Sequence, residues 1–386
     1  GYSMASGEFL TIFDGDDWQH PQKIERLVRG AQKQTDGRLV SAPWTRADED
    51  LFFHYRGWRG AFITPAHVST MFHTPTIRKH LGHWDSVRKA ADTEFILRYR
   101  ALVNDKEPHE VCEAPLTLSL VGSSNLSMED FRLGYRSPDR VSYRDSYEHW
   151  HKKIEAGEHS GYLDFPLAER AFPAPSRFLP SGATQQDLEL DILLVGDFGA
   201  DSLVARLMLE HLASVAGTGQ RIGLMHYPSL LHTASIDSSY SDELLDAFHD
   251  GRYIRVEVTD RVRSAAVSVY DPTAFQYNRE LRSGHTADAV AVWTDQPPYN
   301  WETDEHKYEV GTVERNLLSV FGGPVQWIPL NERTMRVIVE SGHGQKSVGD
   351  HVAQPDTLTI PDTPAEEAPL VLTSSNVGAI EAGETP

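Results

Sequence analysis

Residues 188–198, LELDILLVGDF, and residues 200–217, ADSLVARLMLEHLASVAG, decide the fold class of this chain. The first stretch is an apolar run of strand length. The second stretch has apolar residues at helical spacing and ends at a glycine, which is a common helix stop. A buried strand that leads directly into a helix is the repeating unit of proteins with parallel sheets. This part of the chain is therefore expected to be α/β.

The same alternation continues on the C-terminal side. Further strand-like runs lie at 221–227, 253–258, 288–293 and 325–330, and helical patterns lie at 241–251 and 312–322. Because strands that alternate with helices form parallel βαβ units, we predict a Rossmann-like parallel sheet over 190–345. The segments near residues 192, 222, 254 and 290 should then pair in parallel.

Length and composition limit the classes of protein that need to be considered. A chain of 386 residues is long enough for two domains. Its net charge of −20 would repel a phosphate backbone, so we expect no nucleic-acid partner. One cysteine, Cys112, rules out an intramolecular disulfide framework and a multi-cysteine zinc site. With no membrane-spanning apolar run and no signal peptide, we predict a cytoplasmic protein.

Changes in composition suggest the domain boundaries. We assign 1–155 to a first domain. No helix or domain start signal precedes its first strand at Phe9–Phe13, so we interpret this strand as an interior part of a domain. Residues 156–189 are rich in Pro, Gly and Ser, as in AFPAPSRFLPSGATQQ at 171–186, and suggest an extended linker. Residues 346–386 are acidic and proline-rich, so we expect a disordered tail, in which LVLTS at 370–374 could form one short strand.

The most informative stretch for function is GEFLTIFDGDDWQHPQKIERLV at 7–28. It places Asp14, Asp16 and Asp17 at the end of an apolar strand. Side chains at the carboxyl end of a parallel strand point into the crevice where α/β proteins bind ligands. Because carboxylates that lie close together repel one another, a divalent cation is their natural partner.

Three other kinds of segment could contain such a cluster. The aspartates could form a polar turn in which Asp17 caps the following helix. An EF-hand calcium loop fits positions 1, 3 and 12 but fails because Gln19 stands where glycine is required and Pro21 interrupts the loop. A haloacid dehalogenase phosphatase would need a threonine where Trp18 lies.

The segment FDGDDWQHPQKIERLV resembles the family 2 glycosyltransferases of GT-A fold, in which a hydrophobic strand precedes Asp-x-Asp-Asp, an aromatic residue and an amphipathic helix. The resemblance implies that Asp14 and Asp16 hold Mg²⁺ or Mn²⁺ on the diphosphate of a nucleotide sugar. It also implies that Asp17 and Trp18 lie beside the donor or acceptor. The half of a GT-A domain that binds the base and ribose would precede residue 1.

A second segment, LGHWDSVRKAADTEFILRYRAL at 81–102, resembles the family's acidic helix start, which supplies the catalytic base. Ala91 departs from the acidic pair of the family, so the resemblance assigns the base to Asp92, with Glu94 as the weaker candidate. Trp84 and Arg98 would bind donor or acceptor. The alternative is that Asp92 and Glu94 only favour the helix dipole. Residues 112–127 and 144–153 extend the resemblance to about His151.

The resemblance as a whole implies inverting, metal-dependent transfer of a sugar from a nucleotide-sugar donor to a glycan or lipid-linked glycan of the cell surface. A peripheral location at the inner membrane face would suit such an acceptor. Trp58, in HYRGWRG at 54–60, is a candidate for stacking on the acceptor. A metal site at His149, His151 and His159 is disfavoured, since their spacing does not place them on one helix face.

The second region also carries a resemblance. LLVGDFGADSLVARLML at 193–209 and VFGGPVQWIPLNERTMRVI at 320–338 are similar to the N-terminal domain of GT-B glycosyltransferases. Where those domains usually have a Gly-Gly pair, only Gly199 follows Asp197 and Phe198. The predicted architecture is thus a partial GT-A mixed sheet followed by a Rossmann-like domain. The alternative function is a non-catalytic module that binds a glycan or a partner protein.

Overall fold

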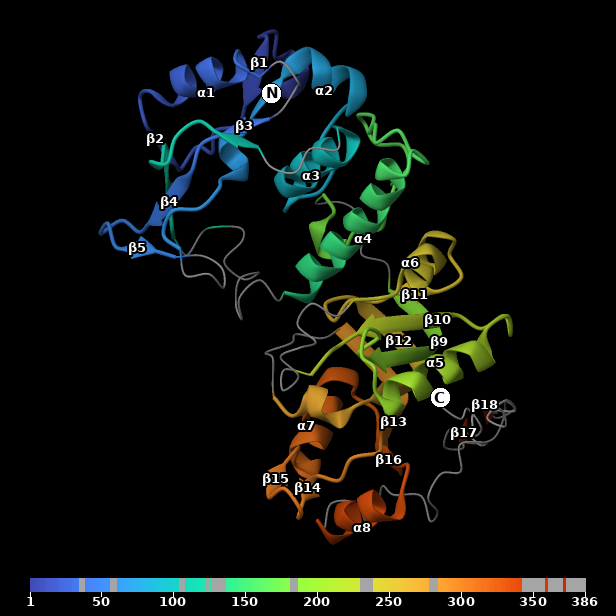
Figure 1. Cartoon of the computed structure of the whole chain (residues 1–386). Helices are drawn as coiled ribbons and strands as arrows, with labels where there is room; N and C mark the ends of the chain where they lie inside the picture. Colours follow the sequence, from blue (N-terminus) through green and yellow to red (C-terminus); the bar gives the residue numbers. More distant parts are fainter. Residues whose placement is uncertain are drawn as a thin grey trace, which may run out of the picture. The chain divides into compact units, whose positions relative to one another are not determined.

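The computed structural model describes residues 1–34, 39–55, 61–103, 108–122, 125, 137–180, 187–229, 239–277 and 284–341, and the backbone of two short strands, β17 (Leu358–Thr359) and β18 (Val371–Leu372). The chain divides into two compact units, Gly1–Ala183 and Thr184–Pro386 (Figure 1). Apart from β17 and β18, which pair antiparallel, the predicted tail at 346–386 lies outside the described residues.

The second unit is built on a six-stranded parallel sheet. Its strands, in spatial order, are β11 (Ile254–Arg255), β10 (Ile222–His226), β9 (Leu188–Gly196), β12 (Arg261–Tyr270), β13 (Gly284–Thr294) and β16 (Val325–Pro329). Numbered along the chain, this order is 3-2-1-4-5-6, which is the order of a doubly wound sheet. The predicted α/β class and the parallel pairing near 192, 222, 254 and 290 are confirmed.

Helices cover both faces of this sheet. They are α5 (Leu203–Val215), α6 (Asp242–His249), α7 (Val310–Phe321) and α8 (Glu332–Glu340). In β9, Ile192 and Leu194 pack in one cluster with residues of α5 and α6, while Leu193 and Val195 pack in the other with residues of α7 and α8. A strand buried on both faces needs apolar side chains in both directions, which is why residues 190–195 are a nearly continuous apolar run.

Two features of this unit were not expected from the sequence. The central strand β12 was missed, because its first half alternates polar and apolar residues and follows β11 after only a few residues. No helix lies between β11 and β12, since residues 256–260 form a short loop with a turn. Helix α8 was missed as well; Asn331 caps it by accepting a hydrogen bond from the Thr334 N–H at 2.8 Å.

The first unit contains two small sheets of four strands each. One sheet has the order β1 (Phe9–Thr11), β6 (Met71–His73), β3 (Val40–Ser41), β7 (His109–Glu110), and the other has β2 (Trp18–Gln19), β8 (Thr117–Leu120), β4 (Trp44–Ala47), β5 (Phe53–His54). The helices are α1 (Lys23–Ala31), α2 (Thr74–His80), α3 (Ala91–Val103) and α4 (Pro138–Glu155). The helix start expected near Asp92 is confirmed, since α3 begins at Ala91.

The pairing of β1 corrects one premise of the sequence analysis. We expected the aspartates to follow a parallel strand, but β1 pairs antiparallel with β6 through Phe9–His73, Leu10–Phe72 and Thr11–Met71. The strand is also shorter than the apolar run Phe9–Phe13. An apolar run predicts a strand but not the direction of its partner, which is contributed here by a segment far along the chain.

Residues 156–180, for which we expected part of an extended linker, belong to the first unit. Leu163, Phe172 and Phe178 are buried in one cluster with Tyr143 and Trp150 of α4. Prolines and glycines suggested an extended linker, and the regular structure of this segment is limited to one short 3-10 helix at Ser176–Phe178. They did not predict that its aromatic side chains complete a core.

Candidate functional site

A cavity of about 720 Å³ in the first unit is the candidate site. Four parts of the chain line it: the aspartate turn between β1 and β2, strand β4 with its neighbours, the segment leading into α3, and one side of α4. Its acidic lining residues are Asp14, Asp16, Asp17 and Asp92. The aspartates that carried the two sequence motifs therefore face a single cavity, although they are far apart in the sequence.

Two hydrogen bonds, one within the turn and one to β8, hold the aspartate turn. The Asp17 N–H donates to the Asp14 carbonyl at 3.3 Å, and the Asp17 carboxylate accepts from the Leu120 N–H of β8 at 3.3 Å. Helix α1 begins at Lys23 with Gln22 as its N-cap, so the alternative in which Asp17 caps that helix is wrong. The aspartates are placed at the cavity without serving the helix that follows them.

The turn is electrostatically crowded. Partial withdrawal from water raises the pKa of Asp14, and the carboxylates of Asp17, Asp16 and Asp92 raise it further. Burial likewise raises the pKa of Asp17, against hydrogen bonds from Ser119 and Leu120 that lower it. A group of carboxylates that repel one another is the arrangement that a bound cation would stabilise.

A buried lysine lies next to this turn. Lys23 donates hydrogen bonds to the Gln19 side chain at 2.7 Å and to the Thr117 hydroxyl at 3.0 Å. Burial lowers the pKa of Lys23 to about 8, while the charges of Asp17 and Asp14 oppose that shift. Lys23 is therefore a fixed neighbour of the aspartates, and no sequence motif indicated it.

Asp92 enters the cavity from the first turn of α3. Its charge is among the causes that raise the pKa of Asp14. Ala90, which also lines the cavity just before α3, has φ +63°, a left-handed conformation that is costly for a residue other than glycine. Such backbone strain is often found at functional sites, where the surrounding structure maintains it.

Glu94 and Arg98 do not line this cavity. Both side chains are fully buried, with Arg98 Nε at 3.0 Å from Glu94 Oε1. Arg98 also donates to the carbonyl oxygens of Leu81 at 2.9 Å, Gly161 at 3.0 Å and His83 at 2.7 Å. His151 Nε2 lies 3.2 Å from the same carboxylate oxygen of Glu94. These residues tie α3 and α4 to two loops, which is a structural role.

The aromatic candidates are dispersed. Trp84 stacks on Phe95 at 3.8 Å between ring centroids, and Trp18 is largely exposed outside the cavity lining. Trp58 lies outside the described residues. Instead, Trp44 lines the cavity; its indole N–H donates to the Thr64 hydroxyl at 2.8 Å, and the Arg46 guanidinium lies 4.3 Å from its ring centre.

Basic residues line the same cavity and were also missed. They are Arg46, Arg88, Lys89, Arg140 and Arg144. Arg140 and Arg144 lie one helical turn apart on α4, and such spacing places two side chains on the same helix face. In a chain with a net charge of −20, that pair was a signal that sequence analysis could have used.

Metal binding would depend on few protein ligands. Across the described residues, no group of three or more His, Cys, Asp and Glu side chains converges closely enough to hold a metal ion. Mg²⁺ is commonly held by one or two carboxylates together with substrate phosphates and water. Asp14 and Asp16 fit that pattern, and His151, one of the disfavoured histidine ligands, is instead beside Glu94.

No protein-family model matches the chain, and the curated proteins contain no match to it. None of the helices in the described ranges combines the length and the apolar character that crossing a bilayer would require.

Proposed function

We propose that the first unit is part of a family 2 glycosyltransferase of GT-A fold, which transfers a sugar from a nucleotide-diphosphate donor to a hydroxyl group of a glycan. The observation that carries this proposal is the meeting of Asp14, Asp16 and Asp92 at one cavity. These residues come from the two segments that resemble the family, and the resemblance requires them to act on one substrate.

In the proposed reaction, Asp92 accepts the proton of the acceptor hydroxyl, and the hydroxyl oxygen forms a bond to the anomeric carbon. The bond from that carbon to the diphosphate breaks, and the nucleoside diphosphate leaves with the electron pair. One displacement of this kind inverts the anomeric configuration. Asp92 suits the role of base because it lies in the first turn of α3, at the cavity and outside the buried Glu94–Arg98 pair.

Mg²⁺ or Mn²⁺, when bound, would neutralise the diphosphate leaving group. Asp14 and Asp16 would hold it, and Asp17 would remain tied to β8 through Leu120. Arg46, Arg88, Lys89, Arg140 and Arg144 would contact the phosphate oxygens or an anionic part of the acceptor. Among the described tryptophans, Trp44 rather than Trp18 or Trp84 would contact a sugar ring, because it lines the cavity.

For the second unit we propose a Rossmann-like domain similar to the N-terminal domain of GT-B enzymes. The strand order 3-2-1-4-5-6 supports this assignment. The acceptor would be a cell-surface glycan or a lipid-linked glycan, as the resemblance of the first unit implies.

Calorimetric titration of the chain with Mn²⁺ alone, and then with pyrophosphate in the presence of Mn²⁺, tests the proposal without knowledge of the donor sugar. We expect saturable, Mn²⁺-dependent binding of pyrophosphate. Asp16→Asn should weaken it by a few kcal/mol, roughly a hundredfold, because a direct ligand is lost. Asp50→Asn, an exposed carboxylate outside the cavity lining, is the matched control and should change nothing.

The competing function is a non-catalytic module. The metal-dependent enzyme would be contradicted if the affinity for pyrophosphate did not depend on Mn²⁺. It would also be contradicted if the Asp16 and Asp50 variants bound pyrophosphate with the same affinity. A positive binding result is followed by a transfer assay, in which release of nucleoside diphosphate from UDP-, GDP- and dTDP-sugars is measured with glycan acceptors. Binding without any turnover would favour the module.

A further inference from the structure

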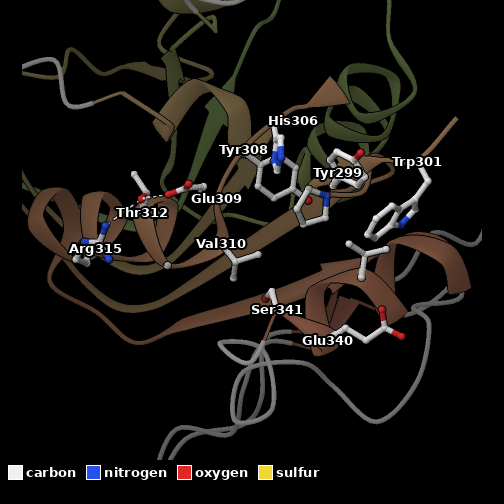
Figure 2. A pocket seen from close by; sticks show the side chains of 13 residues that line it. Tyr299, Trp301, His306, Tyr308, Glu309, Val310, Thr312, Arg315, Glu340 and Ser341 are labelled. Carbon is white, nitrogen blue, oxygen red and sulfur yellow. Dashed lines mark hydrogen bonds between the residues drawn. The ribbon is translucent and has the colours of Figure 1, made fainter. Parts of the chain in front are cut away.

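A second cavity, of about 540 Å³, lies in the second unit and has a different chemical character (Figure 2). It is bounded by the hairpin of β14 (Tyr299–Asn300) and β15 (Glu305–His306), the start of α7 and the end of α8. The residues that give it this character are Tyr299, Trp301, His306, Tyr308, Glu309 and Arg315. In Figure 2 the aromatic side chains lie toward the hairpin, and Glu309 and Arg315 lie toward α7.

The aromatic side presents exposed ring surface. Trp301 lies in the turn of the hairpin and is 69% exposed, although a tryptophan side chain is among the most costly to leave in water. The Tyr299 ring stands edge-on to Trp301 at 4.3 Å and contacts His306 at 4.6 Å. Tyr308, by contrast, is buried and stacks on Trp327, so it forms the base of the cavity.

Several contacts hold this hairpin in place. Tyr299 pairs with His306 across the two strands, and the Tyr299 hydroxyl is hydrogen-bonded to Asp304. Arg333 of α8 donates to Asn300 at 2.8 Å and to Glu302 at 3.3 Å. Trp301 therefore lies in a turn that these hydrogen bonds hold in place, and its side chain lies outside the core. A site that is already ordered loses little conformational entropy when it binds a ligand.

The other side of the cavity is polar and mainly acidic. The Thr312 hydroxyl donates to Glu309 at 3.0 Å, Arg315 donates to Thr312 at 2.9 Å, and Glu340 lines the cavity from the end of α8. Two carboxylates, Glu309 and Glu340, therefore line the cavity beside one arginine, Arg315. On the hairpin, Glu302 and Glu305 are already paired with Arg333 and Lys307. This balance disfavours a phosphate or a carboxylate ligand, and it favours a ligand that donates O–H groups to carboxylate oxygens.

We propose that this cavity binds a neutral oligosaccharide. A pyranose ring has an apolar C–H face that packs on the electron-rich face of an aromatic ring, and its hydroxyl groups donate to carboxylates. Trp301 and Tyr299 would take the ring face, while Glu309, Glu340 and Arg315 would take the hydroxyl groups. The proposal goes beyond the transfer reaction, because it concerns the second unit and is measured by binding alone.

The test uses the whole chain and four neutral linear tetrasaccharides, built from glucose, galactose, mannose or N-acetylglucosamine. Binding is measured by saturation-transfer NMR and by calorimetric titration. We expect saturable binding of at least one tetrasaccharide, and a loss of affinity of about tenfold or more in Trp301→Ala. The melting temperature of that variant should match wild type, because the side chain is exposed. Tyr277→Ala removes another exposed aromatic residue of this unit, outside the cavity, and should bind normally.

A tetragalacturonate of the same length tests the charge argument and should bind more weakly than its neutral counterpart. Three outcomes would overturn the proposal: no saturable binding of any neutral tetrasaccharide at millimolar concentration, equal affinities of the Trp301 and Tyr277 variants, or tighter binding of the tetragalacturonate. None of these outcomes depends on whether the first unit transfers sugars.

Discussion

At the scale of single residues, the charge of Asp14 lowers the stability of the folded protein. Its pKa is raised by partial burial and then by Asp17, Asp16 and Asp92. A carboxyl group whose pKa is raised in the folded state favours folding most at pH values below its ordinary pKa of 3.8, and that contribution is lost as the pH rises through the folded-state value. At neutral pH the ionised Asp14 therefore destabilises the metal-free protein.

The first prediction follows from the destabilising effect of ionised Asp14. Asp14→Asn should raise the melting temperature of the metal-free protein at pH 7, by roughly 1–4 °C, because it removes a repelled charge and keeps the shape. The gain should shrink as the pH falls toward 4, since the wild-type carboxyl group then becomes neutral as well. Thermal unfolding across that pH range measures both effects. Asp50→Asn is the control, and a lower melting temperature for Asp14→Asn at pH 7 would contradict the explanation.

The second prediction concerns Asp92 and rests on the proposed function. Asp92→Asn keeps shape and hydrogen bonding but cannot accept a proton, so turnover should fall by about 10² to 10⁴. Affinity for pyrophosphate with Mn²⁺ should barely change, unlike that of Asp16→Asn. A transfer assay beside the titration separates the two effects. Near-normal turnover of this variant would mean that another residue is the base. Asp85 is a poor candidate for that role, because it is buried between Tyr143 and Arg170.

At the scale of secondary-structure elements, helix α3 separates two acidic residues that look alike in the sequence. Asp92 and Glu94 are two positions apart, a spacing that directs side chains to different faces of a helix. Asp92 faces the cavity, while Glu94 is buried against Arg98 and His151. One short segment therefore supplies a candidate catalytic group and a core ion pair.

The third prediction compares two Glu–Arg pairs with the same spacing of four residues. Arg98→Ala should destabilise the first unit by about 3–5 kcal/mol, because it leaves the Glu94 charge buried without its arginine and removes a donor from the carbonyl groups of Leu81, Gly161 and His83. Arg29→Ala breaks the exposed pair with Glu25 on α1 and should cost about 0.3–0.5 kcal/mol. Urea unfolding curves measure both variants. Similar, small losses for the two variants would contradict the structural role assigned to Arg98.

At the scale of the whole molecule, each unit has its own hydrophobic clusters. The clusters of the first unit surround residues such as Phe95 and Trp150, and those of the second surround Leu193 and Leu194. No cluster contains described residues from both units. Separate cores of this kind are the basis for separate unfolding transitions.

The fourth prediction is that calorimetry of the whole chain resolves two unfolding transitions. Leu193→Ala, at a fully buried position of the central strand β9, should cost about 2–5 kcal/mol and lower one transition. Arg98→Ala should lower the other. If both variants shift a single common transition by similar amounts, the units do not unfold separately.

The sequence by itself determined the α/β class and the parallel sheet, because apolar runs of strand length alternate with helical patterns along the chain. It also indicated the start of α3 through the acidic residues near Asp92. It also placed four aspartates in two segments for which one site was expected. The packing of residues 156–180 was missed, because their aromatic side chains form a core only with α4, and β12 was missed because half of it alternates like an exposed strand.

Only the tertiary structure decided which of these residues meet. It brought Asp92 to the cavity of Asp14, turned Glu94 and Arg98 into the core, paired β1 antiparallel, and added Trp44 and the basic residues. Local patterns report which side of an element is apolar. They do not report which distant segment covers that side, because pairing and burial depend on the complete core, and that core exists only once the whole unit has folded.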